Sequence, residues 1–346
     1  MYDIENNYKS IKMKSISNIE AIRKKIVNTT EHAVKITKLI NTIEGADTNC
    51  NVNCNGFGRI RKYQQFQLFF DNSRQRGKKL LRGLNPETTC YTSQVFQIEG
   101  CNIRCWYCYV DDCALAACSE EAEWITVDDM LDLFFQNNTP PYIIDLSGGQ
   151  PDLVPEWCFW IMQDIEKRGM KDNVFVWLDD NLTTVHLMEN YLTVDEIIYM
   201  SSFPKHSRTC CFKGYDENSY TFNTRSSATS LDLQLKNFKK LFDYGFDLYA
   251  YVTLTGPRGN VTKDKLSYFM DELQKIHPFL PLRTIPLIIK NFNATSLRLN
   301  TTYKEALKEQ YLAFEYWDTL LGNRFTFSER QIPYEDIKMR NVPGAQ

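Results

Sequence analysis

Three cysteines stand close together in the segment GCNIRCWYCYVDD, with the spacing C-x3-C-x2-C at Cys101, Cys105 and Cys108. Thiolates are soft ligands that select iron–sulfur clusters or zinc. Three of them in one short loop can surround a cubic iron–sulfur cluster and leave one iron open, as catalytic metal sites do. The spacing alone also permits a zinc site without an obvious fourth ligand, or buried structural cysteines.

A second motif, SGGQP, begins at Ser147 and follows a run of β-forming residues, YIIDL. Glycine is needed where the backbone must approach a ligand closely or adopt a conformation that a side chain blocks. On its own the motif is also compatible with an ordinary turn.

Both motifs follow predicted strands of an α/β pattern. Short β-rich runs alternate with amphipathic helical segments from about residue 90 to residue 290. The predicted strands are 93–99, 142–147, 174–178, 196–201, 246–254 and 282–289. The predicted helices between or after them are 126–136, 156–167, 231–244 and 303–321. Such alternation favours a parallel sheet whose ligand sites lie at the carboxyl ends of the strands. Six units are too few for a closed eight-stranded barrel, so we expect an open, partial barrel.

The cysteine spacing, with the aromatic Tyr107 before the last cysteine, resembles the signature of the radical S-adenosylmethionine (radical SAM) enzymes. This resemblance implies a partial (β/α)6 TIM-like barrel and a [4Fe–4S] cluster on the three cysteines. The open iron would bind the amino and carboxylate groups of S-adenosyl-L-methionine (AdoMet). Reductive cleavage of AdoMet would then give a 5′-deoxyadenosyl radical that abstracts a hydrogen from the substrate. An electron donor of the flavodoxin or ferredoxin type is implied as a partner.

The resemblance also assigns cofactor-binding positions. The SGGQP motif resembles the family's GGE segment, with Gln150 in place of the usual glutamate; its amide oxygen can still accept a hydrogen bond from an ammonium. The stretch LDDN resembles the LDTN stretch of the enzymes that activate glycyl-radical proteins, which assigns Asp179 to the ribose hydroxyls. Its acidic residues are equally compatible with capping the following helix. The expected AdoMet contacts are Tyr107, Ser147, Gly148, Gly149, Gln150, Asp179 and Ser201.

A pair of adjacent cysteines, Cys210 and Cys211, follows Lys205, His206 and Arg208. Neighbouring positive charge lowers the pKa of a thiol and makes it reactive. We therefore expect this pair to lie in a loop at the active face and to act as a catalytic hydrogen donor.

The two ends of the chain differ from the 90–290 barrel. Residues 1–89 are expected to be an N-terminal helical and basic extension, with apolar residues at helical spacing over 19–26 and 36–43. A capping box is expected at Ser17 and Glu20. Residues 59–82 hold eight basic side chains against the single acid Asp71. We interpret this stretch as a solvated helix face rather than a nucleic-acid contact. Residues 291–346 are expected to be a C-terminal helical tail.

The composition narrows the class of protein further. The 346 residues include 43% hydrophobic and 24% charged residues with a net charge of −3, as in globular proteins that are soluble. No apolar run approaches the roughly 18 residues of a membrane helix, and the amino terminus has no signal-peptide core. We therefore expect a cytoplasmic protein with neither a membrane nor a nucleic-acid partner. Disulfides are rare in that compartment, so the 11 cysteines favour metal chemistry.

Three questions stay open at this level. The substrate can be a small molecule, a peptide or a protein. The alternatives to a general radical SAM enzyme are an activating enzyme for a glycyl-radical protein and a non-catalytic iron–sulfur binding or sensing protein. Cys50, Cys54 and Cys90 are candidate ligands of a second cluster.

Overall fold

The strands of the main sheet run through most of the chain. In the computed structural model, which describes residues 18–47, 50–64, 90–332, 334–337 and 339, eight strands lie in the order β11-β10-β9-β8-β7-β5-β4-β3. The parallel strands are β5 (Cys90–Gln97), β7 (Tyr142–Ser147), β8 (Val174–Asp180), β9 (His206–Phe212), β10 (Leu248–Val252) and β11 (Thr284–Pro286). β4 (Gly58–Gln64) and β3 (Asn51–Asn53) extend the sheet in antiparallel pairing. The predicted α/β partial barrel with six parallel strands is confirmed.

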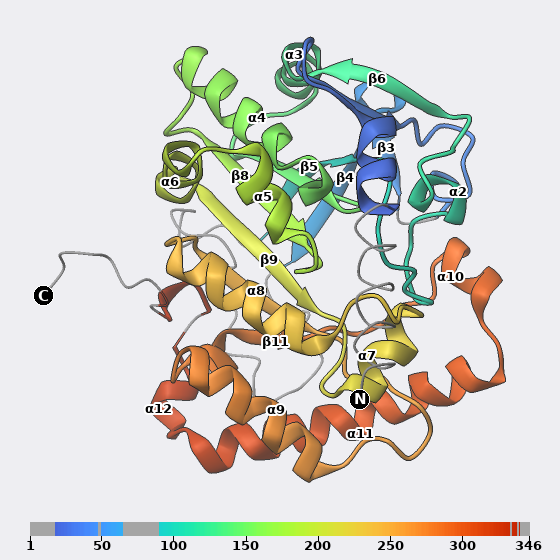
Figure 1. The fold of residues 1–346 in the computed structure, drawn as a ribbon, viewed down its shortest axis with the longest axis vertical. Helices are drawn as coiled ribbons and strands as arrows, with labels where there is room; N and C mark the ends of the chain where they lie inside the picture. The colour runs from blue at the N-terminus through green and yellow to red at the C-terminus, as the bar shows by residue number, and fades with distance from the viewer. Residues whose placement is uncertain (1–17, 48–49, 65–89, 333, 338, 340–346) are drawn as a thin grey trace, which may run out of the picture.

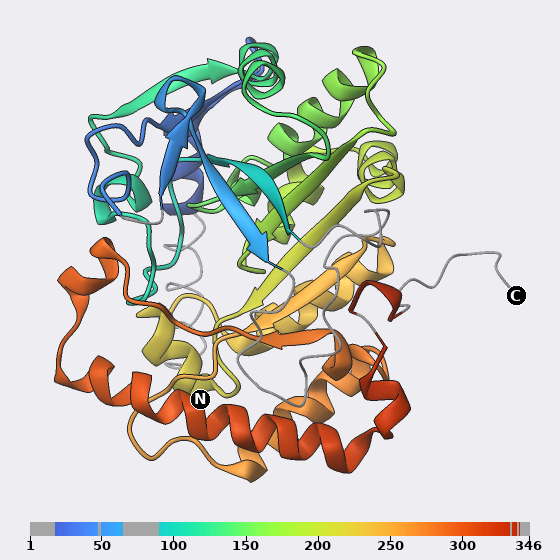
Figure 2. The ribbon, with the colours of Figure 1, turned by 180° about the vertical axis from the view of Figure 1, so that it is seen from behind.

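Helices cover one face of this sheet, and Figure 1 shows α4, α5, α6 and α8 in front of the strands. Seen from behind, β4 and β5 lie in front instead (Figure 2). α3 (Val127–Asn137) follows β6 (Ala122–Thr126), and α4 (Pro155–Lys167) follows β7. Two helices follow each of the next two strands: α5 (Val185–Tyr191) and α6 (Val194–Ser202) after β8, and α7 (Glu217–Thr224) and α8 (Leu231–Asp243) after β9. α9 (Lys263–Ile276) follows β10. The short helices are α2 (Asp112–Leu115), α10 (Asn293–Arg298) and α12 (Phe327–Arg330), and α11 (Thr301–Arg324) is the longest in the described part of the chain. Within the described residues, 3-10 turns span Cys54–Gly56, Pro151–Leu153, Leu280–Arg283 and Tyr334–Asp336.

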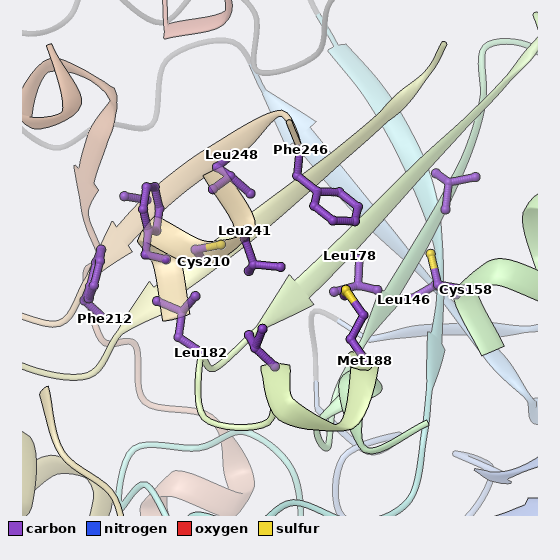
Figure 3. Packing of buried hydrophobic residues seen from close by; sticks show 14 of the residues in the cluster. Leu146, Cys158, Leu178, Leu182, Met188, Cys210, Phe212, Leu241, Phe246 and Leu248 are labelled. Carbon is purple, nitrogen blue, oxygen red and sulfur yellow. The ribbon is translucent and has the colours of Figure 1, made fainter. Parts of the chain in front are cut away.

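Alternation along the strands separates two cores. Leu146, Leu178 and Leu248 face the helices and belong to the large core shown in Figure 3. Their neighbours Trp177 and Tyr249 face the opposite side and form a smaller aromatic cluster. Because successive side chains of a strand point to opposite faces, this alternation decides which residues lie on the inner face of the barrel.

One predicted strand and one predicted helix are wrong. Residues 196–201 belong to α6 rather than to a strand, because Thr193 and Glu196 form a capping box that starts a helix. The fourth parallel strand is β9, which follows α6 in the chain. The helical spacing over 36–43 does not correspond to a helix: residues 36 and 37 end the strand β2 (Ala33–Thr37), and residues 38–43 contain no helix. β2 pairs with β1 (Val27–Asn28) and β6 in a second, three-stranded antiparallel sheet. In the N-terminal region, residues 18–26 are helical as expected, whereas the capping position Ser17 and residues 65–82 of the basic stretch lie outside the described residues.

Both terminal regions pack on the barrel. Arg23 forms a buried ion pair with Glu156 of α4. β4 pairs with β5 over its whole length, so Arg59 and Arg61 of the basic stretch lie on a strand and not on a helix face. On the other side, α11 lies beside α9 along one edge of the molecule in both views (Figures 1 and 2).

Candidate functional site

The three-cysteine loop directly follows β5, and two neighbouring segments hold its backbone. Gly100 N and Cys101 N donate to Ala114 O and Leu115 O of α2, at 2.8 and 2.9 Å. Farther along the loop, Arg104 N and Trp106 N donate to the last carbonyls of α7, those of Thr224 and Asn223. The loop contains no regular secondary structure of its own, so these bonds determine its path.

The thiols of the loop lie in an apolar environment. Cys101 and Cys105 are buried and Cys108 is partly buried, in a cluster with Trp106 and Tyr107. Burial raises the pKa of Cys101 and raises that of Cys108 to about 12, and the proximity of Cys105 contributes in both cases. Such thiols are neutral unless a bound cation stabilises the thiolates. Three soft donors around one loop fit a cubic cluster, in which each thiolate binds a different iron.

The C-terminal region supports the loop from outside. The ring of Tyr303 stacks on Trp106, with centroids 4.5 Å apart and planes 4° from parallel. Arg298 donates to the carbonyls of Cys108 and Val110, and Thr295 Oγ1 donates to Tyr107 O at 3.2 Å. Sequence reasoning treated residues 291–346 as a tail and did not anticipate these contacts.

The glycine loop after β7 lies directly against the three-cysteine loop. Gln150 N donates to Gly100 O at 2.8 Å. Gly148 and Gly149 both have positive φ, +69° and +53°, and a Cβ at Gly149 would lie 2.3 Å from Ile98 O and 2.5 Å from Gly100 O. Only glycine combines this backbone conformation with so close an approach, so the structure supplies the physical reason for the motif.

The side chain of Gln150 is buried, and its polar atoms bind other parts of the protein. Its Oε1 accepts from Asn181 N at 3.0 Å, and its Nε2 donates to Asp180 Oδ1 and Thr184 Oγ1, each at 2.9 Å. The amide oxygen that was expected to face an ammonium is therefore used to join the loops after β7 and β8. The backbone of the glycine loop is left as the part that can contact a ligand.

The two aspartates at the end of β8 have different roles. Asp180 accepts from Leu182 N at 2.7 Å and pairs with the buried Arg208, so it has the local turn-forming role. Asp179 lies on the other face, where Ser147 Oγ donates to its Oδ2 at 2.7 Å. Asp180 therefore holds the turn after β8 and does not cap the following helix, since α5 begins after Thr184 without a side-chain cap. Asp179 is left at the inner face.

Polar residues that the sequence did not single out surround Asp179. Tyr109 OH lies 3.1 Å from Ser147 Oγ, and Arg61 Nη1 of β4 lies 3.7 Å from Asp179 Oδ2. Arg59, two residues earlier, lies over the ring of Tyr109. The spacing of the two arginines at i and i+2 was the available signal, but it was interpreted as helical.

Tyr107 reaches the end of another strand. Its hydroxyl lies 2.8 Å from Thr253 Oγ1, just after β10. Lys213, just after β9, is the cation whose charge lowers the pKa of both Cys101 and Cys211, against the larger effect of burial. The carboxyl ends of β5, β7, β8, β9 and β10 therefore all contribute to one region around the three-cysteine loop.

The adjacent cysteines occupy opposite faces of β9. Cys210 is completely buried in the helix-covered core (Figure 3) and cannot contact a substrate there. Cys211 is on the inner face and partly exposed. The predicted lowering of the thiol pKa is wrong: burial raises that of Cys210 strongly and that of Cys211 to about 12. The charge of Arg208 lowers the pKa of Cys210, but burial and the nearby Asp180 carboxylate outweigh this effect. Arg208 itself pairs with Asp152 and Asp180.

The predicted position of Ser201 is also wrong. Ser201 is in the last turn of α6, where its Oγ donates to Ile198 O at 3.1 Å. Since α6 precedes β9, Ser201 lies toward the amino end of that strand, at the edge of the sheet opposite the three-cysteine loop.

The other cysteines divide by exposure. Cys54 is buried, its Sγ lies 3.6 Å from Leu133 O of α3, and burial raises its pKa to about 12. Cys50 is partly buried, and the side chain of Cys90 lies outside the described residues. Among the described residues, no three His, Cys, Asp or Glu side chains converge on a common point for a single metal ion.

The fold and the site define an α/β partial barrel with a three-cysteine loop at the carboxyl edge of its parallel sheet. No family model matches the chain, and no curated protein matches it either. Among solved structures it is similar to "Native anSMEcpe with bound AdoMet", at 16% identity and a TM-score of 0.41, over 66% of this chain and 60% of that chain. It is also similar to a mutant of spore photoproduct lyase with bound AdoMet and dinucleoside spore photoproduct, at 12% identity and a TM-score of 0.46, over 66% and 73%.

A third similar structure is that of the cobalamin-dependent S-adenosylmethionine radical enzyme OxsB, at 15% identity and a TM-score of 0.36, over 64% of this chain and 30% of that chain. The chain spans 58–60% of the length of two anSMEcpe structures that it matches. In the described part of the chain, no helix is both long and apolar enough to cross a membrane.

Proposed function

We propose that this chain is a radical SAM enzyme whose [4Fe–4S] cluster is held by Cys101, Cys105 and Cys108. The observation that supports it most strongly is the bond from Gln150 N to Gly100 O. This bond brings the glycine loop against the cysteine loop, so a cofactor bound at an open iron would meet the backbone of Gly148 and Gly149. Neither a zinc site nor an ordinary turn requires that contact.

When bound and reduced, the cluster held by Cys101, Cys105 and Cys108 would supply the electron that cleaves AdoMet to a 5′-deoxyadenosyl radical, and this radical would abstract a hydrogen atom from the substrate. The chain's own residues would bind and orient AdoMet. Asp179 is suited to accept hydrogen bonds from ribose hydroxyls, because Ser147 and Arg61 hold its carboxylate at the inner face. Trp106 and Tyr107 keep the loop apolar, which excludes water from a reactive radical. A one-electron donor of the flavodoxin or ferredoxin type is proposed as the partner.

Of the adjacent cysteines Cys210 and Cys211, we propose only Cys211 as a hydrogen donor. It faces inward beside Lys213, whereas Cys210 faces the core. Donation would break the S–H bond, form a C–H bond on the product radical and leave a thiyl radical. The thiyl radical would return to the thiol by taking one electron from the same donor and one proton.

The test uses the full chain under anaerobic conditions with iron, sulfide, a reductant and AdoMet. We expect bound iron and sulfide, absorption typical of a [4Fe–4S] cluster and formation of 5′-deoxyadenosine without added substrate. Cys105→Ser should lose the cluster absorption and the product. The matched control is Cys158→Ser, a buried cysteine on α4 that should retain both. A wild-type protein that binds a cluster but forms no 5′-deoxyadenosine would favour a non-catalytic iron–sulfur protein and refute the proposal.

A further inference from the structure

Two exposed cysteines that the proposed reaction does not use follow the three-cysteine loop. Cys113 is in α2 and Cys118 lies three residues beyond its end. The helix ends in a Schellman motif: Cys118 N donates to Cys113 O, Ala117 N donates to Ala114 O, each at 3.1 Å, and Ala117 has a φ of +55°. In this motif the side chains at the first and sixth positions meet. The C-x4-C spacing places a cysteine at each of those two positions.

The side chains of this pair are in contact. The Cys118 thiol donates to Cys113 O at 3.4 Å, and Cys118 is close enough to raise the pKa of the Cys113 thiol. Both are solvent-exposed, unlike the other cysteines whose exposure the structure describes. A small reagent can therefore reach two sulfur atoms that already lie side by side.

The same short helix holds the start of the three-cysteine loop. Ala114 O and Leu115 O, both between the two cysteines, accept the hydrogen bonds of Gly100 N and Cys101 N. A covalent link from residue 113 to residue 118 would close a ring around these two carbonyls. Two backbone hydrogen bonds therefore connect the segment between Cys113 and Cys118 to the first cysteine of the loop, so a change in the redox state of the pair can reach that cysteine.

We propose that Cys113 and Cys118 form a reversible disulfide by exchange with a low-molecular-weight disulfide such as oxidised glutathione. The Cys118 thiolate attacks the reagent, forms a mixed disulfide and releases one glutathione thiolate, which takes up the proton lost by Cys118. The Cys113 thiolate then attacks Cys118 Sγ and releases the second glutathione, which takes up the other proton. Two protein thiols are oxidised and one glutathione disulfide is reduced to two thiols. The Asp111 carboxylate raises the pKa of Cys113, which is why the first attack is assigned to Cys118.

The test is a thiol titration by mass spectrometry on the full chain without cluster or AdoMet, so its result is independent of the proposed function. Protein is equilibrated anaerobically over a series of glutathione ratios, alkylated and cleaved before aspartate. The fragment from Asp112 to the residue before Asp128 contains no cysteine other than Cys113 and Cys118. We expect a shift from the doubly alkylated fragment to an unalkylated one that is two mass units lighter than the dithiol. This form should exceed the mixed glutathione disulfide at least tenfold, since the second attack is intramolecular.

Two single-cysteine variants and one control variant of the three-cysteine loop test this assignment. Cys113→Ser and Cys118→Ser should each accumulate only the mixed disulfide. A variant in which Cys101, Cys105 and Cys108 are all alanine should still form the link. The proposal is overturned if the wild-type fragment stays doubly alkylated, stops at the mixed disulfide, or is cross-linked to the fragment of the three-cysteine loop.

The connection to the loop has its own measurement. In the disulfide form we expect hydrogen exchange at the amides of Gly100 and Cys101 to slow several-fold, because the carbonyls that they bond become more rigid. Amides of Asp243 and Gly245, far along the chain at the end of α8, serve as the internal reference. Unchanged exchange at Gly100 and Cys101 would overturn the coupling.

Discussion

Replacing Gly149 with alanine should separate the glycine loop from the three-cysteine loop. The new methyl group would lie 2.3 Å from Ile98 O and 2.5 Å from Gly100 O, so one backbone must move. The left-handed conformation costs a non-glycine residue about 1–2 kcal/mol. Loss of the bond from Gln150 N to Gly100 O adds about 1 kcal/mol. We therefore expect the free energy of unfolding to fall by about 2–3 kcal/mol.

The control for this variant is Gly169→Ala. Gly169 has a φ of +70°, and a Cβ there would have no neighbour within 4 Å, so this variant carries only the conformational cost of about 1–2 kcal/mol. Urea unfolding of the apoprotein compares the two, and AdoMet affinity of the reconstituted protein should weaken in Gly149→Ala alone. Equal unfolding midpoints and equal AdoMet affinities in the two variants would refute the reasoning that close approach requires the glycine.

Three further predictions follow from the structure. Cys211→Ala should reduce product formation with little loss of stability, whereas Cys210→Ala should lower the unfolding midpoint and leave the reaction per folded molecule unchanged; the reverse pattern would show that the faces of β9 are misassigned. Arg208→Met should destabilise the protein by about 3–5 kcal/mol in urea unfolding, because two buried carboxylates lose their partner. The surface control Arg168→Met should cost about 1 kcal/mol or less, and equal effects would argue against this role. Burial raises the pKa of Asp216, but hydrogen bonds at the start of α7 outweigh burial and lower this pKa overall. The charged Asp216 therefore stabilises the fold fully above the ordinary pKa of an aspartate, and this stabilisation is lost as the pH falls through the lower pKa of the folded state. Asp216→Asn should therefore flatten the acid side of the melting-temperature profile, and a profile as steep as that of the wild type would contradict the assignment.

Much of the barrel was predictable because its signals are local. The strand 142–147 and the helix 156–167 were placed within one residue of β7 and α4. The helix at 126–136 was anticipated from its cap, and Thr126 does accept from Asp129 N at 3.1 Å. Each of these elements carries its own periodicity or capping residue, so neighbours in the fold are not needed to recognise it.

The errors occur where local signals conflict with tertiary contacts. The run EIIYMS has β-forming residues but belongs to α6, and the Thr193 cap was the signal that favoured a helix. The true strand β9 begins with the polar run HSRT. Its Arg208 is tolerated in the core because Asp152, far away in the sequence, pairs with it. No local pattern predicts that partner.

The sequence by itself determined the spacing of Cys101, Cys105 and Cys108, the donor chemistry of their loop and the presence of a glycine pair after a strand. These follow from residue type and local order. Only the tertiary structure decided that the glycine loop lies on the cysteine loop, that Cys211 faces inward while Cys210 is buried, and that Asp179 meets Arg61. The physical reason is that parallel strands bring their carboxyl ends to one edge of the sheet, while the pleat sends adjacent side chains to opposite faces.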